Sequence, residues 1–354
     1  MIQINFQSIG GAPGKIAIRR PVAPTGVGDT RKNQENRKYK RNSARHYRYF
    51  TTLPGGPAPR YNLYMPEAPQ WLKKQIGASK AALRSLDARR TDGDISCASL
   101  HTVCLSARCP NRGKCFSAGD ATFLILGDIC TRGCRFCAVG RGKPLPPEPA
   151  EPEKIAATAL KWKLRYAVIT SPTRDDLTDG GAGHFARTVA ALRQVSPAIK
   201  TELLVPDFAG STTALATVLS SRLEVLAHNV ETVPQLYSKA RAGADYKRSL
   251  ALLEAAAKAG ALTKSGYMVG LGETKEQLKA LTKDLGGAGC KLLSVGQYLS
   301  PSKQHCAVEK YYEPPEFEEL AALARENGIP AVLSGPLVRS SYKAGELYRQ
   351  YLSK

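Results

Sequence analysis

The sequence has no run of apolar residues that approaches the ~18 positions needed to cross a bilayer, so a membrane-spanning protein is not expected. Acidic residues are also scarce: 30 Asp and Glu face 51 Lys and Arg, which gives a formal net charge of +21. No secretory leader is recognisable, and the count of nine cysteines is odd. A disulfide framework is therefore not expected, and metal ligation in a reducing compartment fits the cysteines better.

Much of the basic charge lies at the start of the chain. Residues 1–64 hold 12 Lys and Arg against two acids, a net +10, which leaves +11 for residues 65–354. This segment lacks apolar periodicity and is rich in Gly, Pro, Arg, Lys and Asn, which predicts disorder. It could be an organelle transit peptide, a basic arm for nucleic acid or a membrane surface, or upstream sequence added by a wrong start, with Met65 as the real initiator.

From residue 121 the chain alternates short apolar runs with amphipathic stretches. The runs are bounded by Gly, Pro, Asp or Ser, as buried parallel strands are. In one of the amphipathic stretches, Leu278, Leu281 and Leu285 share a helix face. The expected strands are 121–127, 165–170, 200–205, 223–228, 264–270 and 291–296, and the expected helices are 151–162, 180–195, 244–257 and 314–327.

Six strand–helix units predict a parallel sheet with right-handed crossovers. Periodicity does not distinguish an open doubly wound sheet from a full or partial (β/α) barrel. In either architecture, ligands gather at the carboxyl ends of the strands. After the last helix, residues 330–334 are expected to lead into a polar tail.

Three cysteines follow the first expected strand with the spacing C-x3-C-x2-C, at Cys130, Cys134 and Cys137. Three thiolates can hold a [4Fe–4S] cube and leave one iron open, because an electron-transfer cubane takes four cysteines. S-adenosylmethionine could chelate that iron through its amino and carboxylate groups. The alternatives are a zinc knuckle from Cys134 and Cys137, which would want a closed set of four ligands, or cysteines that are simply buried.

This motif resembles that of the radical SAM superfamily, in which Phe136 matches the aromatic residue before the third cysteine. Residues 266–273 resemble the superfamily's G-x-I-x-G-x-x-E stretch, with Met268 in the isoleucine position. The resemblance implies a full or partial (β/α) barrel, and binding of S-adenosylmethionine by Phe136, Met268 and Gly270. On its own, the Gly-rich stretch would be a common junction between a strand and a helix.

An earlier trio, Cys104, Cys109 and Cys115, has the spacing C-x4-C-x5-C. Pro110 and Gly113 predict a turning loop rather than a helix, which could bring the three sulfurs round one centre. A fourth ligand must come from elsewhere. A structural zinc site completed by a distant residue is the alternative interpretation.

Together the two trios resemble those of the lipoyl synthase family, which pairs an auxiliary C-x4-C-x5-C cluster with a radical SAM cluster in this order. In that family a C-terminal R-S-S-Y motif supplies a serine oxygen as the fourth auxiliary ligand. The motif is 339–342 here, which implies Ser341 as that ligand; without the family it would be taken for a surface serine. The resemblance runs from about Leu100 to Glu346 and includes 100–104, 121–127, 174–177, 179–181, 205–208, 296–301 and 334–339.

Four positions depart from the family pattern, and none is an expected cluster ligand. Leu105 and Ser106 replace two acids, Lys114 replaces a glutamate, and Pro172 replaces a small apolar residue. These changes affect the expected loop structure and surface charge near the auxiliary site rather than the chemistry. The short link 115–121 resembles bacterial members, which implies a cytoplasmic bacterial protein; a mitochondrion or plastid is the alternative if residues 1–64 are a transit peptide.

The resemblance implies a radical SAM sulfurtransferase of lipoate biosynthesis and protein lipoylation, with two [4Fe–4S] clusters and S-adenosylmethionine. Two sulfur atoms from the auxiliary cluster would enter C6 and C8 of an octanoyl group on a carrier lysine. The implied partners are the glycine cleavage H protein, the 2-oxoacid dehydrogenase E2 and a ferredoxin- or flavodoxin-type reductant, with no nucleic acid and no membrane. The alternatives are a sulfur-inserting radical SAM enzyme acting on tRNA and a zinc-containing nucleic-acid-binding protein.

The expected architecture is a partial (β/α)6 barrel over 121–300, with extensions at 65–120 and 301–354 that complete the auxiliary site. The latter extension would hold a helix and the tail with the serine ligand.

A few further residues have open roles. Residues 174–176 follow the second expected strand and either bind the amino-acid part of S-adenosylmethionine or stabilise loops. Residues 228–229 end a strand and are candidates to face the cofactor, and His184, in a helical pattern, is expected to be exposed or capping. Glu202 points inward or outward according to a register that the sequence does not fix. Cysteines without ligand spacing, expected to be packing or incidental, are Cys97, Cys290 and Cys306.

Overall fold

The computed structural model describes residues 63–353. The segment 1–62, on which the predictions of disorder, a transit peptide or a wrong start depend, lies outside the described residues. Within the described part, no helix is long and apolar enough to cross a membrane.

The main sheet has seven parallel strands that pair in chain order, β1-β4-β5-β6-β7-β8-β9. A doubly wound sheet would reverse its order at a switch point, so the unbroken order excludes that architecture. Among residues 63–353 the sheet does not close on itself, because β1 and β9 each pair with one strand, and the predicted partial barrel is confirmed. The strands are β1 (Thr122–Leu124), β4 (Tyr166–Thr170), β5 (Lys200–Leu204), β6 (Val225–Ala227), β7 (Leu262–Val269), β8 (Leu292–Gln297) and β9 (Ala331–Gly335).

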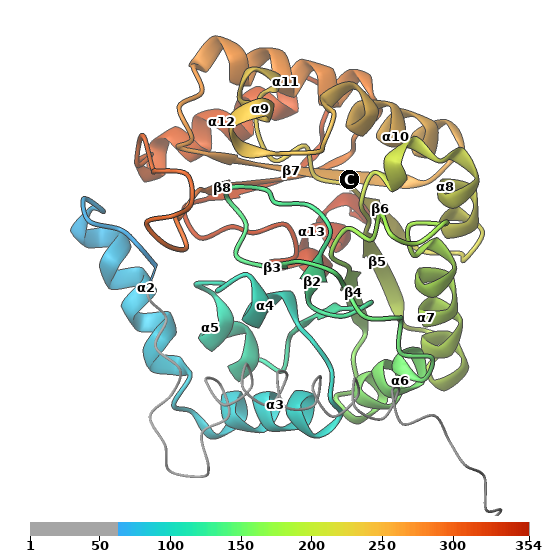
Figure 1. Ribbon diagram of the computed structural model, residues 1–354. Coiled ribbons are helices and arrows are strands. Elements are labelled where there is room, and N and C mark those ends of the chain that lie inside the picture. Colours follow the sequence, from blue (N-terminus) through green and yellow to red (C-terminus); the bar gives the residue numbers. More distant parts are fainter. Residues whose placement is uncertain (1–62, 354) are drawn as a thin grey trace, which may run out of the picture. The chain divides into compact units, whose positions relative to one another are not determined.

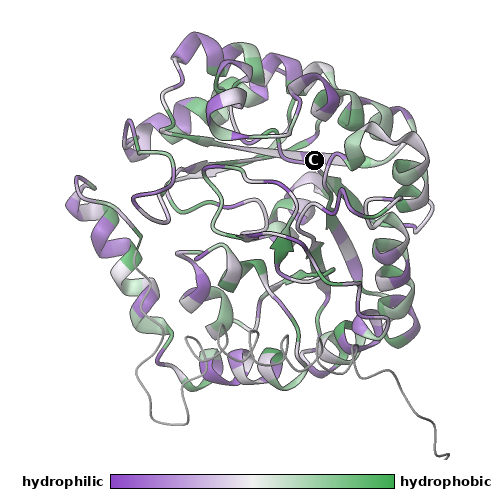
Figure 2. Ribbon diagram, in the orientation of Figure 1, coloured by the Kyte–Doolittle hydropathy of each residue, from purple (hydrophilic) through white to green (hydrophobic). Residues whose placement is uncertain are grey.

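Helices follow most of these strands and cover the outer face of the sheet (Figure 1). Each carries hydrophilic and hydrophobic residues side by side, as amphipathic helices do (Figure 2). In α11, Leu278, Leu281 and Leu285 are all buried, as their spacing predicted, and a capping box between Thr274 and Gln277 begins the helix. The covering helices are α6 (Glu151–Lys161), α7 (Ala182–Val195), α8 (Thr212–Leu219), α10 (Tyr246–Lys258), α11 (Lys275–Gly287) and α12 (Pro314–Glu326).

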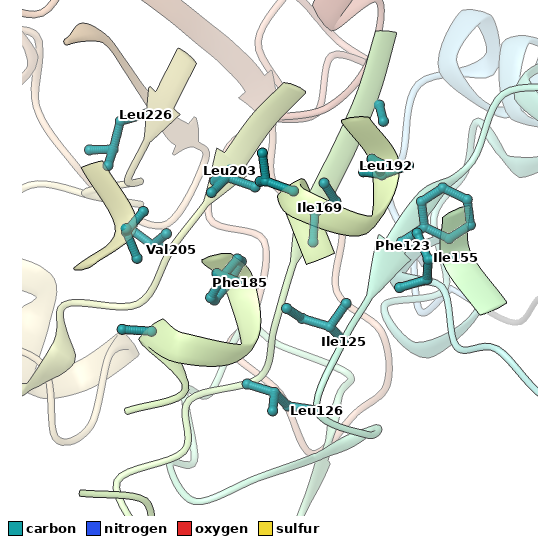
Figure 3. Close-up of a cluster of buried hydrophobic side chains, with 14 of the residues drawn as sticks. Phe123, Ile125, Leu126, Ile155, Ile169, Phe185, Leu192, Leu203, Val205 and Leu226 are labelled. Carbon is teal, nitrogen blue, oxygen red and sulfur yellow. The ribbon is translucent and has the colours of Figure 1, made fainter. Parts of the chain in front are cut away.

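The largest apolar core lies between the first strands and their helices (Figure 3). Leu203 of β5 belongs to this core, together with Phe185 and Leu192 of α7. Because successive strand residues point to opposite faces, Glu202 must point to the concave face of the sheet. There its carboxylate is 2.7 Å from Lys264 Nζ and accepts a hydrogen bond of 2.8 Å from the Tyr166 hydroxyl. This settles the register that the sequence left open.

Between residue 63 and β1 the chain forms four helices: α2 (Gln70–Ala82), α3 (Leu86–Cys97), α4 (Val103–Ser106) and α5 (Arg112–Ser117). The chain after α12 adds β9 to the sheet and then forms α13 (Ala344–Leu352). The prediction of a polar tail was therefore wrong. Leu347 of α13 is buried against Leu292 and Ala331, and the ring of Tyr348 lies 5.6 Å from that of Tyr166.

Short elements make the connections near the carboxyl ends of the strands. Two of them, β2 (Ile129–Cys130) and β3 (Gly140–Arg141), form a separate parallel pair. The others are η1 (Phe208–Gly210), η2 (Pro234–Leu236) and α9 (Tyr237–Ala240).

Candidate active site

A cavity of about 330 Å³ lies at the carboxyl ends of the strands, where parallel α/β folds place their ligands. Residues after β4, β5 and β6 form its wall, together with the C-terminal residues of β7 and β8. Both cysteine trios contribute to the lining, although they are separate in the sequence. The expected ligands that line it are Cys104, Cys109, Cys130, Cys134, Cys137 and Ser341.

The loop that carries Cys130, Cys134 and Cys137 is closed at its base by the β2–β3 pair. Cys130 pairs in register with Arg141, and the Gly142 N–H donates to the Cys130 carbonyl at 3.1 Å. The loop is also attached to the end of β4, because the Thr131 N–H donates to the Thr173 carbonyl at 3.0 Å. The three thiols are therefore presented by a backbone of defined conformation.

Arg132, inside this loop, binds two aspartates on neighbouring loops. Its guanidinium lies 2.8 and 2.9 Å from the carboxylate oxygens of Asp175, and 2.7 and 3.0 Å from those of Asp207. Burial alone would raise the pKa of Asp207, but the hydrogen bond and charge of Arg132 outweigh it and lower that pKa to about 2. Arg132 was not singled out from the sequence, since its partners follow two other strands.

The far side of the same loop is held by α9 and by residues 302–306. The Arg135 N–H donates to the Ala240 carbonyl at 2.8 Å, and the Cys306 N–H donates to the Arg135 carbonyl at 2.9 Å. The His305 Nε2–H donates to the Cys137 carbonyl at 3.1 Å. His305 was also not predicted from the sequence, because no local pattern connects it with the cysteines.

Two cysteines of the first trio lie on short helices and Cys109 lies in the link between them, so the prediction of one turning loop was wrong. Cys104 lies in α4, which begins after Thr102 with a side-chain cap, and Cys115 lies in α5. Gly113 allows α5 to pack closely against α2 and does not form a turn, because a Cβ there would collide with the Ser79 carbonyl oxygen of α2. The turn is confined to the short link between α4 and α5.

The C-terminal motif 339–342 lies beside the first trio. The Asn111 side chain donates to the Leu337 carbonyl, which attaches the segment to the link between α4 and α5. Arg339 interacts electrostatically with Cys109, and Tyr342 interacts with Cys115 and Cys109. Ser341 lines the cavity together with Cys104 and Cys109, whereas Cys115 does not line it.

Burial makes deprotonation of these thiols costly in the absence of a positively charged centre. Burial raises the pKa of Cys104 to about 12, of Cys134 to about 11 and of Cys137 to about 12. Ligation requires thiolates, so iron would have to offset that cost. Among residues 63–353 no group of three or more His, Cys, Asp or Glu is placed to hold a metal ion. A cube of irons and sulfides needs its ligands round a volume, and the donors here line a cavity.

Two of the three residues expected to bind S-adenosylmethionine line the cavity. Phe136 and Met268 pack against an apolar cluster that includes Tyr298. Gly270 does not line the cavity; its φ is +100°, and a Cβ there would collide with Gln297 Nε2 and the Lys310 carbonyl oxygen. Packing therefore accounts for the glycine at 270.

The two histidines with open roles differ from each other. His228 lines the cavity, its Nδ1–H donates to the Val205 carbonyl at 2.8 Å, and burial lowers its pKa to about 4. His184 is buried, not exposed or capping as predicted, and its Nε2–H donates to Glu151 at 2.7 Å. A helical pattern shows which residues share a face, but it does not show that a hydrogen bond to another helix will bury one of them.

Residues 174–176 stabilise loops in the structure. Arg174 is 1% exposed and donates to the carbonyls of Leu126 and Leu145, both at 2.9 Å. Its guanidinium also binds Asp176 at 2.8 Å, whereas Asp175 binds Arg132. Of the cysteines without ligand spacing, Cys290 and Cys306 are buried and Cys97 is exposed.

Glu231 is a further cavity residue that the sequence did not indicate. It follows β6 with a φ of +67°, a left-handed conformation that is uncommon for a residue with a side chain. Burial raises the pKa of its carboxyl group, and the carboxylate interacts electrostatically with Cys134 and Cys137. The Asn229 amide donates to it at 3.1 Å.

Comparison with known proteins gives the family. Residues 124–285 match the model of the radical SAM superfamily. The lipoyl synthase of Methylococcus capsulatus is 50% identical over 281 residues, which cover 78% of this chain and 85% of that protein. The lipoyl synthase of Trichlorobacter lovleyi is 52% identical over 280 residues, covering 78% and 96%. That of Caldicellulosiruptor saccharolyticus is 50% identical with the same coverage. The chain belongs to the lipoyl synthase family of radical SAM enzymes.

Proposed function

We propose that the protein completes the lipoyl cofactor by inserting two sulfur atoms, at C6 and C8, into an octanoyl group bound to a carrier lysine. Membership of the lipoyl synthase family supplies the reaction. The single observation that supports it in this chain is the gathering of five cysteines from both trios, with Ser341, round one cavity.

The proposed ligands divide into two sets. Cys130, Cys134 and Cys137 would hold the radical SAM cluster. When bound, that cluster and S-adenosylmethionine supply the one-electron chemistry, and the auxiliary cluster supplies the sulfur. The auxiliary ligands would be Cys104, Cys109, Cys115 and Ser341.

The remaining cavity residues would bind and orient the substrate and keep water out of the site. An unactivated C–H bond offers no handle for acid–base catalysis, so the wall must position the octanoyl chain and keep the site dry. Val103, Leu124, Leu204 and Leu299 give the cavity an apolar wall of the kind that an alkyl chain prefers. Phe136 and Met268 would pack against the adenosyl group, and Arg132 would orient the loop between the first two ligands.

Ser341 has a chemical role in this proposal. A hard oxygen ligand is more labile on iron than a thiolate, which would help that iron leave as sulfide is consumed. Ser341→Cys should therefore keep the iron of both clusters but lose the dithiol product. Iron analysis and mass spectrometry of the carrier peptide measure the two quantities, and full activity in this variant would defeat the role.

We also propose the partner proteins and the cellular compartment. The carrier would be the glycine cleavage H protein or the 2-oxoacid dehydrogenase E2, with a ferredoxin- or flavodoxin-type reductant, in the cytoplasm. The +11 charge of residues 65–354 supports these carrier proteins as binding partners, because lipoyl carrier domains are typically acidic. We assign the auxiliary extension to 65–120, the six-stranded barrel core to 121–300 and the C-terminal extension, which adds β9 to the sheet, to 301–354.

One experiment tests the central proposal. The protein, purified without oxygen, is incubated with S-adenosylmethionine, a reductant and an octanoylated carrier peptide. We expect a brown protein with about eight irons, together with 5′-deoxyadenosine and a peptide that has gained two sulfurs. A colourless zinc protein that forms no 5′-deoxyadenosine would overturn it.

A further inference from the structure

Glycines in two adjacent strands open a path across the floor of the cavity. Gly266 of β7 lies beside Ser294 of β8 in register, and Gly296 of β8 lies beside Met268. A Cβ at Gly266 would lie 3.0 Å from the Asn229 Oδ1 atom, so the Asn229 side chain passes over β7 at that point. A Cβ at Gly296 would collide with the Val338 carbonyl oxygen, so the C-terminal segment lies directly on β8.

Two hydrogen bonds follow this path. The Ser340 hydroxyl donates to Asn229 Oδ1 at 2.9 Å, and Asn229 Nδ2 donates to Glu231 Oε1 at 3.1 Å. The amide of Asn229 thus accepts at one end and donates at the other. All three residues line the cavity. We call this arrangement the Ser340–Asn229–Glu231 chain.

Charged groups at the two ends of the chain interact electrostatically with different cysteine loops. Ser340 lies between Ser341 and Arg339, and Arg339 interacts electrostatically with Cys109 of the first trio. At the other end, the Glu231 carboxylate interacts with the second trio through Cys134 and Cys137. The chain therefore attaches the segment that carries Ser341 to Glu231, which lines the same cavity as Cys134 and Cys137.

We propose that Ser340 is a positioning residue that sets the Ser341 segment at a fixed place relative to the second cysteine loop, through Asn229 and Glu231. The inference rests on the proposed role of Ser341 as an auxiliary ligand. Hydrogen abstraction and sulfur donation must reach the same carbon of one substrate, so the relative position of the two loops matters. A displacement of about 1 Å can cost about 100-fold in rate.

The test uses the holoenzyme, three variants and one control variant. Ser340→Ala removes the hydroxyl that donates to Asn229, and Ser340→Thr restores a hydroxyl at the same place. Asn229→Leu interrupts the chain from the other side. Ser334→Ala is the matched control, because the Ser334 hydroxyl is buried without a hydrogen-bond partner among the described residues.

Two measurements report on position rather than on activity alone. Hydrogen exchange of the peptide over 336–343 should quicken in Ser340→Ala and in Asn229→Leu, although residue 229 lies far from that peptide in the sequence. In Ser340→Ala the ratio of 5′-deoxyadenosine to dithiol product should rise roughly tenfold, within the range that such a displacement allows. Iron content should stay at about eight. Ser340→Thr should recover most of both signals, and Ser334→Ala should match the parent protein.

The inference would be overturned if Ser340→Ala had the same hydrogen exchange over 336–343 and the same ratio of 5′-deoxyadenosine to dithiol product as the parent protein. Its failure is distinguishable from failure of the proposed function through Ser341→Ala. If Ser341→Ala loses auxiliary iron while Ser340→Ala behaves as the parent protein, only the positioning role is wrong. If Ser341→Ala keeps all its iron and forms product, the ligand assignment itself is wrong.

Discussion

Arg132 makes the largest set of charged contacts in the loop of the second trio. A lysine in its place would keep the charge but could not bind both carboxylates of Asp175 and Asp207 through one planar fork. We expect Arg132→Lys to lower the free energy of unfolding by about 1–3 kcal/mol and to lose iron from the second trio preferentially. Denaturant unfolding and iron analysis measure these effects. Arg248→Lys is the control, since Arg248 makes one 3.3 Å contact with Asp207 and is partly exposed; an equal loss there would contradict the prediction.

The buried pair of Glu202 and Lys264 gives a second prediction for single residues. Both side chains are at most 1% exposed, so removing one partner leaves an unpaired charge on the concave face of the sheet. Lys264→Met should lower the free energy of unfolding by about 3–5 kcal/mol. The double variant with Glu202→Leu should be more stable than Lys264→Met, although the Tyr166 hydroxyl loses its acceptor. Additive losses in denaturant unfolding would show that the two residues act independently.

For single residues, the sequence predicted what local spacing encodes. The two cysteine patterns were visible because the cysteines of each trio lie within a few residues of each other. Arg132, His305 and Glu231 were missed, because their partners follow other strands and only the fold brings them together. His184 was misplaced for the same reason, since the Glu151 carboxylate that buries it belongs to another helix.

For whole elements, strands bounded by turn residues were predicted well and the C-terminal elements were not. The six expected strands all occur, because a strand buried on both faces reads as a short apolar run. The seventh, β9, was taken for a link to a tail, and α13 was missed although Leu347 and Tyr351 are four residues apart. Its apolar face is narrow, and the surface that it covers is formed by strands distant in the sequence.

Gly296 gives a prediction about how the C-terminal segment lies on β8. In Gly296→Ala the new methyl group would collide with the Val338 carbonyl oxygen, so the segment that carries Ser341 must move. We expect loss of about four irons per chain, with those of the second trio retained, measured by iron analysis and Mössbauer spectroscopy. Gly287→Ala in α11 is the matched control, since a Cβ there meets nothing within 4 Å. Unchanged iron in Gly296→Ala would show that the segment tolerates displacement.

For the molecule as a whole, charge is the property that composition states directly and a fold does not alter. The formal net charge is +21, and residues 65–354 account for +11 of it. Such a charge attracts an acidic partner over a distance set by the Debye length, which is about 10 Å at 0.1 M salt. Charge complementarity acts mainly on the rate of encounter, whereas chemistry inside the cavity does not depend on the surface charge of the carrier.

Salt should therefore separate the recognition of the carrier from the chemistry. Raising the salt concentration from about 0.05 to 0.5 M should lower kcat/KM for an acidic octanoylated carrier domain by roughly tenfold, because screening shortens the reach of the net positive charge. Under saturating carrier, kcat should change little. A short uncharged octanoyl-lysine peptide is the control, and its kcat/KM should vary by no more than about twofold, since no extended surface is recognised. Equal sensitivity of the two substrates would place the effect of salt in the cavity or on the clusters, and the net positive charge would then have no part in choosing the carrier.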